Sequence, residues 1–216
     1  DNITVAGVTF AHTAQTWVPS VGGRYAVNSN GDFTANNQRG GAVWIGESSG
    51  VTIRNSLFSQ LGGSGVMMYG AVAGCAIDGN EFAWLGEGGV TSVGRVALNN
   101  ATAFSYPRRN RIVGNHFHHL GLWVKAVAGV TQFLSARNTI SENVIYATPR
   151  SSILLNDNMG GFNVLERNLL FDSNLETNAH GPLSSWSRMP YINLEGSPDG
   201  RPTVTPAWNL LRQNFV

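Results

Sequence analysis

One short stretch of the sequence gathers groups that could bind or transform a sugar. Glu176, His180, Trp186 and Arg188 fall within thirteen positions. A carboxylate and an imidazole could share acid–base work. The guanidinium could bind a uronate carboxylate, and the indole could stack on a sugar ring. The alternative is a packed loop with an internal Glu–Arg ion pair, and the residue types leave both interpretations open.

Further candidate groups lie upstream of this stretch. Lys125 and Arg150 could act as bases in an elimination if their pKa values were lowered, although a lone Lys or Arg is normally solvated. Asp157 belongs to Asn156-Asp157-Asn158, whose oxygen spacing resembles that of calcium ligands but lacks the rest of an EF-hand loop; the run is also typical of a turn before Gly160-Gly161. The candidate catalytic groups are Glu176, His180 and Asp157, and the candidate substrate-binding groups are Arg188, Trp186, Arg150 and Lys125.

A histidine cluster, His116, His118 and His119, could bind a metal ion. Side chains two positions apart in a strand project from the same face, so His116 and His118 would point together while His119 is offset. No acidic residue is adjacent in the sequence. We therefore predict surface or turn histidines here, with neither a metal site nor a cofactor.

The elements that position these groups repeat along the chain. An apolar residue lies two or three places before, and another one or two places after, each of a set of recurring asparagines at 55, 80, 115, 143, 168 and 214. The spacings include 80−55=25 and 168−143=25 residues. About 25 residues at roughly 3.3 Å each make three short strands and three turns, which is one coil of a parallel β-helix.

Elementary chemistry accounts for the residues in the repeat. Stacked coils place equivalent residues about 4.8 Å apart. An Asn in a tight turn tolerates left-handed backbone geometry, and stacked Asn side chains can form a hydrogen-bonded ladder. We predict an all-β, right-handed parallel β-helix as a single domain over 1–216, with insertions at about 19–41, 96–109 and 187–205 on one side, as walls of a lateral groove. The sequence opens inside a repeat, so we expect further N-terminal coils and a cap in a longer chain.

Composition narrows the classes of partner. The formal net charge is +1, from 14 Lys+Arg and 13 Asp+Glu, which does not favour nucleic acid. The sequence contains no run of about 18 apolar residues, so we expect no insertion into a membrane. The single cysteine, Cys75, rules out a disulfide framework and predicts a small buried hydrophobe. Sequons at Asn2 and Asn100 fit an extracellular or cell-surface location.

Several stretches resemble a large family of right-handed parallel β-helix proteins in the pectate-lyase-like superfamily, related to glycoside hydrolases. They are residues 2–14, 82–86, 148–161, 168–171 and 176–188. The family usually reads Glu-Thr-x-Asp-His-Gly-Pro-x-x-Ser-Trp-Asp-Arg in the last stretch, whereas this chain has Ala179 and Ser187 in place of the two aspartates. It also has Val124-Lys125-Ala126-Val127-Ala128 where the family favours Gly-Lys-Gln-Thr-Ser. The resemblance implies that Glu176, His180 and Arg188 can hold sugar even if a reaction that needs the missing carboxylates is lost.

Three functions fit this sequence. The first is a polysaccharide hydrolase or lyase, and the second is a degenerate copy that binds glycan without cleaving it. The third is a structural module of an extracellular filament, surface fibre or flagellar hair, since a stiff solenoid is suited to building fibres. The expected partners are polysaccharide or glycoprotein glycan, and other extracellular structural proteins in the third case.

Overall fold

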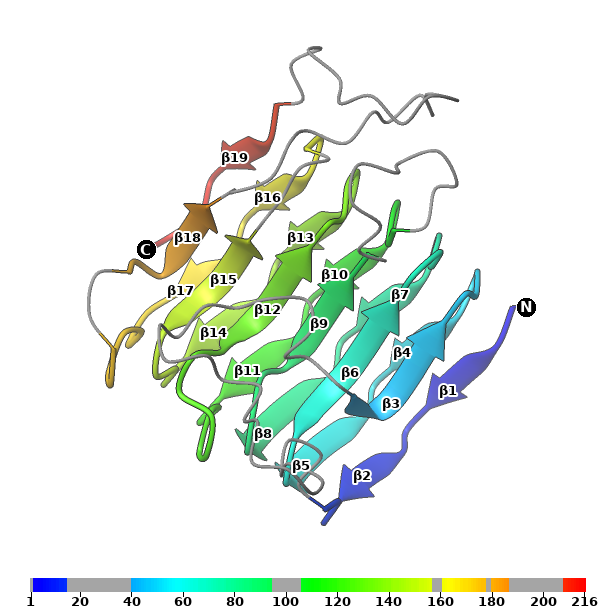
Figure 1. Ribbon diagram of the computed structural model, residues 1–216, viewed down its shortest axis with the longest axis horizontal. Coiled ribbons are helices and arrows are strands. Elements are labelled where there is room, and N and C mark those ends of the chain that lie inside the picture. The colour runs from blue at the N-terminus through cyan, green and yellow to red at the C-terminus, as the bar shows by residue number, and fades with distance from the viewer. Residues whose placement is uncertain (1, 15–39, 95–105, 157–160, 178–179, 187–207) are drawn as a thin grey trace, which may run out of the picture.

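A computed structural model describes residues 2–14, 40–94, 106–156, 161–177, 180–186 and 208–216. In these ranges the regular elements are nineteen β-strands, arranged in three sheets (Figure 1). Every paired strand runs parallel to its neighbours, as for β4 (Thr52–Arg54) and β7 (Ala76–Asp78). Within the same ranges, the chain contains no helix of the length and apolarity needed to cross a membrane.

The three sheets take their strands in strict rotation along the chain. Sheet A contains β1 (Thr4–Ala6), β4, β7, β10 (Arg111–Val113), β13 (Thr139–Ser141), β16 (Val164–Glu166) and β19 (Leu210–Arg212). Sheet B contains β2 (Thr9–Ala11), β5 (Leu57–Leu61), β8 (Glu81–Leu85), β11 (His116–His118), β14 (Val144–Tyr146) and β17 (Leu169–Leu170). Sheet C contains β3 (Gly41–Gly46), β6 (Ser64–Tyr69), β9 (Val90–Val93), β12 (Ala128–Phe133), β15 (Ser151–Asn156) and β18 (Leu183–Trp186).

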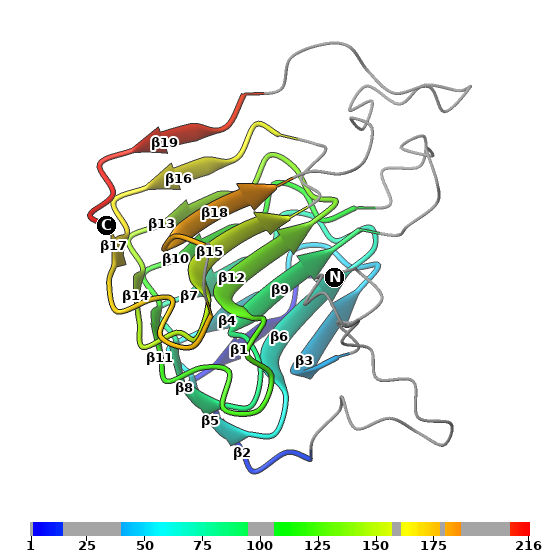
Figure 2. The same ribbon diagram turned by 60° about the vertical axis from the view of Figure 1, so that its left-hand side comes forward.

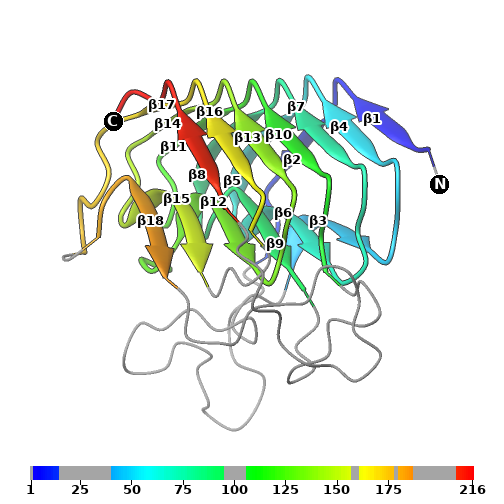
Figure 3. The same cartoon turned by 90° about the horizontal axis from the view of Figure 1, so that it is seen from above.

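Each passage through sheets A, B and C makes one coil, and successive coils stack in register. Figures 2 and 3 show the coils side by side, from β1 and β2 in blue at one end to β19 in red at the other. Ile53 pairs with Ile77, Ile77 with Ile112, and Ile112 with Ile140. The predicted all-β parallel solenoid is confirmed.

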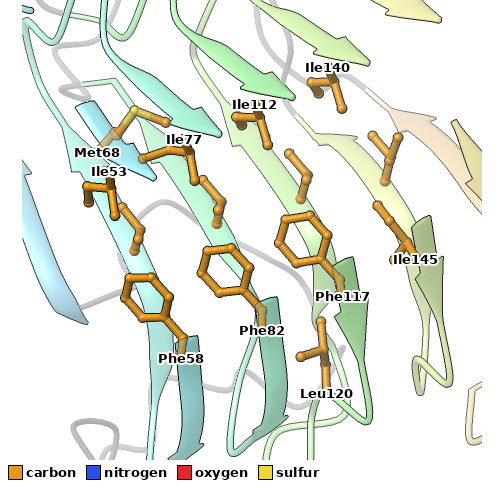
Figure 4. Packing of buried hydrophobic residues seen from close by; sticks show 14 of the residues in the cluster. Ile53, Phe58, Met68, Ile77, Phe82, Ile112, Phe117, Leu120, Ile140 and Ile145 are labelled. Carbon is orange, nitrogen blue, oxygen red and sulfur yellow. The ribbon is translucent and has the colours of Figure 1, made fainter. Parts of the chain in front are cut away.

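The core consists of ladders of identical or similar side chains. Phe10, Phe58, Phe82 and Phe117 stack with ring centroids 4.6 Å apart at each step, and Figure 4 shows the last three beside the isoleucine ladder. The rings of Phe58, Phe82 and Phe117 are fully buried. Since the centroid spacing is close to the spacing of about 4.8 Å between neighbouring strands, the register of sheet B fixes the stack.

Glycines near the beginning of the strands of sheet C make room for these rings. A Cβ on Gly65 would lie 2.7 Å from Cδ1 of Phe82, and a Cβ on Gly89 would lie 2.4 Å from Cδ1 of Phe117. In the next coil a Cβ on Gly129 would lie 2.6 Å from Cγ2 of Ile145. The glycine column and the aromatic column are therefore two halves of one packing arrangement.

An asparagine ladder joins the coils at the turn between sheets A and B. Asn115 donates from Nδ2 to the Asn143 Oδ1 at 3.0 Å and to the Ile77 carbonyl at 2.8 Å, and its backbone N–H donates to the same Asn143 Oδ1 at 2.9 Å. The same pattern runs through Asn80, Asn115, Asn143, Asn168 and Asn214. The predicted ladder is confirmed for these residues.

Two details of the predicted ladder are wrong. The place expected for Asn55 belongs to Ser56, whose backbone N–H donates to Asn80 Oδ1 at 3.0 Å. The left-handed backbone is found at Asn55 as expected (φ 49°), but in later coils it falls one residue before the asparagine, as at Gly79 (φ 62°) before Asn80 and Glu142 (φ 59°) before Asn143. The ladder asparagines instead satisfy buried backbone groups, which explains their burial.

A second ladder, not recognised in the sequence, runs along the turn between sheets C and A. It comprises Asn110, Asn138, Asn163 and Asn209, each accepting the backbone N–H of the equivalent residue in the preceding coil. Cys75 occupies the place before Asn110 and is 1% exposed. Burial raises the pKa of its thiol, so its predicted role as a small buried hydrophobe is confirmed.

The predicted insertions all border sheet C. Residues 19–41 fall between β2 and β3, at the entry to the sheet, whereas 96–109 and 187–205 follow β9 and β18, at its exit. Most of their residues lie outside the described ranges. The lateral groove that they were predicted to wall stays a prediction.

Candidate functional site

Four of the seven sequence-predicted groups lie where the chain passes from sheet B to sheet C. We define the B–C corner as residues 119–127, 147–150 and the described part of 171–182, which join β11 to β12, β14 to β15 and β17 to β18. Three successive coils thus bring Lys125, Arg150, Glu176 and His180 to one edge of the solenoid. Lys125 and Glu176, which are 51 positions apart, come into contact because the coils stack in register.

Backbone hydrogen bonds hold the last of these turns on the preceding one. The Asn174 N–H donates to the Arg150 carbonyl at 2.6 Å, and the Glu176 and Thr177 N–H groups donate to the Pro149 carbonyl at 3.1 Å. The Thr177 hydroxyl donates to the same carbonyl at 3.1 Å. The segment that carries Glu176 is thereby fixed against the turn that carries Arg150.

Glu176 forms an ion pair with Lys125 from two coils away. The Lys125 Nζ donates to Glu176 Oε1 at 2.8 Å, and the two side chains are 40% and 50% exposed. An exposed pair of this kind contributes about 0.2–1 kcal/mol. A carboxylate ligand could therefore replace Glu176 beside Lys125 at little cost.

Arg150 and His180 supply positive charge and an imidazole to the same corner. Arg150 is only 8% exposed. Burial, followed by the charge of Arg150, lowers the pKa of His180. The side-chain amide of Asn174 donates to the His180 carbonyl and ties the residue to the turn. His180 is thus a neutral hydrogen-bonding group near neutral pH, beside a fixed cation.

Of the three predicted catalytic groups, the structure describes Glu176 and His180. Within the described ranges no hydrogen bond or ion pair links Glu176 to His180, and Glu176 is bonded to Lys125. The alternative of an internal Glu–Arg pair involves Arg188 and stays untested. Asp157 and Arg188 lie outside the described residues, as do the departures Ala179 and Ser187. The arrangement favours binding through charge over a paired acid and base.

One exposed indole lies at the B–C corner, and another lies at the opposite end of the last strand of sheet C. Trp123 lies on the same turn as Lys125 and is 57% exposed. Trp186, predicted to stack on a sugar, ends β18 opposite Asn156 of β15 and is 44% exposed. Exposed indoles offer flat apolar faces at low conformational cost, as sugar-binding surfaces require.

The histidine cluster gains an acidic partner that sequence adjacency did not reveal. Glu81 pairs in register with His116 across β8 and β11. The Glu81 Oε1 lies 3.2 Å from His118 Nε2. Burial and the neighbouring His118 lower the pKa of His116, while Glu81 opposes that shift. The signal was present in the repeat, because Glu81 and His116 each directly follow a ladder asparagine.

Glu87 is a buried carboxyl group that sequence reasoning did not single out. It lies between β8 and β9, is 4% exposed, and accepts a hydrogen bond from the Ser64 hydroxyl at 2.9 Å. Burial raises the pKa of Glu87 to about 7, although the bonds from Ser64 oppose that rise. A buried acid of this kind makes folding stability depend on pH.

Comparison with known proteins identifies the fold family. The model of the right-handed β-helix region matches residues 22–192, which is more than half of the chain. No curated protein and no solved structure shows significant similarity to the chain. The match agrees with the three parallel sheets and with the resemblance seen in the sequence, while the relation to glycoside hydrolases stays a prediction. The chain belongs to the right-handed β-helix family.

Proposed function

We propose that this β-helix domain binds an acidic polysaccharide, with uronate sugars contacting the B–C corner. The observation that carries the proposal is the convergence of Lys125, Arg150 and His180 from three successive coils. A repeating ligand fits a repeating scaffold, because each coil offers its side chains one strand spacing along the axis. The same proposal places the protein outside the cell or at its surface, where such polymers occur.

The three basic groups would have different roles. Lys125 is the exposed contact for a uronate carboxylate, since its pairing with Glu176 is weak and reversible. Arg150 is mostly buried and supplies a fixed positive charge behind the contact surface. His180, kept neutral by its lowered pKa, offers a hydrogen bond to a sugar hydroxyl.

Exposed indoles complement these charges. Trp123 is two positions from Lys125 on the same turn, and Trp186 lies on the last strand of sheet C. A pyranose ring has apolar C–H faces, which stack on an indole while its carboxylate reaches a cation. Charge and stacking together favour an acidic sugar over a neutral one.

The proposal favours binding over cleavage. Acid–base catalysis needs groups within hydrogen-bonding reach of the bond that is cleaved. Glu176, the most plausible acid or base from the sequence, is instead bonded to Lys125. In the binding role, Glu176 stays paired with the Lys125 ammonium group until the carboxylate of a uronate replaces it.

Calorimetric titration of the chain with a polyuronate and with a neutral polysaccharide tests the proposal. We expect the polyuronate alone to bind, with an affinity that falls as salt increases. Lys125→Gln should weaken binding, whereas Arg54→Gln, the same charge change on an exposed residue of sheet A, should not. Glu176→Gln should tighten binding by up to about fivefold, which corresponds to the ion pair's value of at most about 1 kcal/mol.

Parallel depolymerisation assays distinguish the other functions. Release of products that is lost in Glu176→Gln would establish an enzyme in place of a binding domain. Preference for the neutral polymer would contradict the charge-based site. Absence of both binding and turnover would refute the proposal and favour a structural module, for which self-assembly in electron micrographs is the appropriate assay.

A further inference from the structure

The outer face of sheet B carries a cluster of metal-ligating groups separate from the B–C corner. Glu81 begins β8, and His116 and His118 lie on β11. One ligand atom from each residue can be chosen so that all three lie within 4.8 Å of one another. We propose that these three side chains bind a divalent transition-metal ion of the zinc type.

The parallel pairing of β8 with β11 brings the three side chains together on one face of sheet B. Phe82 and Phe117 follow Glu81 and His116 and point into the core, where both rings are fully buried. Side chains alternate across a strand, so Glu81, His116 and His118 face outward together. Register pairing of Glu81 with His116 brings the carboxylate beside the two imidazoles.

The distances suit a first-row metal ion. Ligand atoms about 2.0–2.1 Å from a tetrahedral zinc ion are about 3.3 Å apart. The His118 Nε2 and the Glu81 Oε1 are already 3.2 Å apart. His116 needs only a side-chain adjustment to complete a face of three ligands, because its ligand atom lies within 4.8 Å of the other two. Two imidazoles and one carboxylate favour zinc over magnesium or calcium, which prefer oxygen ligands alone.

His119 and Trp84 provide the outer support that bound imidazoles usually have. The His118 Nδ1 lies 2.8 Å from the His119 Nδ1, so a metal on Nε2 leaves the Nδ1 proton of His118 to be donated to His119. The His119 ring stacks on Trp84 with centroids 4.0 Å apart. Such second partners orient the ligating ring, and losing one typically costs tenfold to hundredfold in metal affinity.

The cluster leaves a coordination position toward solvent. The Glu81 side chain is 50% exposed, and that of His118 is 11% exposed. An ion held by these three groups would have protein on one side and solvent on the other. Three protein ligands with an open position are typical of zinc sites that bind a water molecule or an exogenous ligand.

Calorimetric titration of the metal-free chain with Zn²⁺ alone tests the site, with Co²⁺ absorption in the visible range as a second readout of nitrogen and oxygen coordination. We expect one ion per chain. Its dissociation constant should rise more than tenfold in His116→Gln, His118→Gln and Glu81→Gln, and tenfold to hundredfold in His119→Phe, which keeps a ring to stack on Trp84. His12→Gln and Glu142→Gln, which alter an exposed histidine and an exposed carboxylate elsewhere, are matched controls that should leave it unchanged.

Thermal unfolding without metal checks that each variant folds. Should a histidine variant unfold, Glu81→Gln decides the question. Glu81 is exposed and is the first residue of β8, so its replacement should leave the fold intact. Failure of the wild-type chain to bind Zn²⁺ would overturn the proposal, as would Zn²⁺ binding that Glu81→Gln and His116→Gln leave unchanged. Lys125→Gln should not alter the zinc titration, so this result is independent of polysaccharide binding.

Discussion

The buried carboxyl of Glu87 gives a quantitative prediction for stability. Its pKa is about 7 in the folded chain, against an ordinary value of 4.5. Between these two values the folded state keeps a proton that the unfolded state has released. The stabilising contribution of this proton is therefore fully present below pH about 4.5 and is lost as the pH rises through about 7. The perturbation is Glu87→Gln, a neutral side chain of nearly the same volume.

The size of the effect follows from the shift. The difference of 7−4.5=2.5 pH units at about 1.36 kcal/mol each corresponds to about 3 kcal/mol of unfolding free energy. The conversion applies because Glu87 is 4% exposed and solvent screens it little. The amide oxygen of a glutamine can still accept the hydrogen bond of the Ser64 hydroxyl.

Urea unfolding at pH 4.5 and at pH 8, in both proteins, measures this effect. The lowered pKa values of His116, His119 and His180 make stability rise with pH over part of the same range, so the difference between wild type and variant isolates Glu87. We expect Glu87→Gln to exceed the wild type by about 3 kcal/mol at pH 8 and to equal it near pH 4.5. Glu142→Gln, an exposed acid, is the control. Equal pH profiles for Glu87→Gln and wild type would refute the reasoning.

Three further predictions concern the ladders. Asn143→Ala should lower the free energy of unfolding by about 3 kcal/mol in chemical denaturation, because it leaves the buried Asn115 N–H unsatisfied and removes two donated bonds; a loss under about 1 kcal/mol would contradict this. Phe117→Ala should cost about 3–5 kcal/mol by the same measurement, since it opens a cavity in the aromatic stack. Gly89→Ala should cost about 1–3 kcal/mol because its Cβ would meet Phe117 and the Gly129 carbonyl oxygen, and combining it with Phe117→Ala should relieve only the part due to the ring.

The fold was predictable because every coil restates the same pattern. An apolar residue on either side of a polar turn residue recurs in each repeat. The repeated pattern therefore identifies the fold even where a single coil departs from it. The exact ladder position was harder to predict, since Asn55 and Ser56 are both small polar residues and only the backbone shows that Ser56 aligns with Asn80. The second ladder is a weaker signal in the sequence because it is shorter, with Cys75 in the asparagine's place before Asn110.

The residues of the candidate site could be predicted from the sequence, but their side-chain contacts could not. Lys125, Arg150, Glu176 and His180 were all recognised from their residue types, and the stacked coils do bring them to one corner. The Lys125–Glu176 bond joins residues 51 positions apart. Such a contact depends on turn lengths in two coils, which residue types alone do not determine. Aligning the repeats by register would have exposed the pairing of Glu81 with His116.

The most direct test of the central claim is a crystal structure of the chain with a bound oligo-uronide, grown at a ligand concentration that saturates calorimetric binding. The account predicts a uronate carboxylate within hydrogen-bonding distance of Lys125 Nζ, with Glu176 displaced from that cation and a sugar ring against Trp123 or Trp186. An oligo-uronide bound at another face of the solenoid, with the Lys125–Glu176 bond intact, would contradict it.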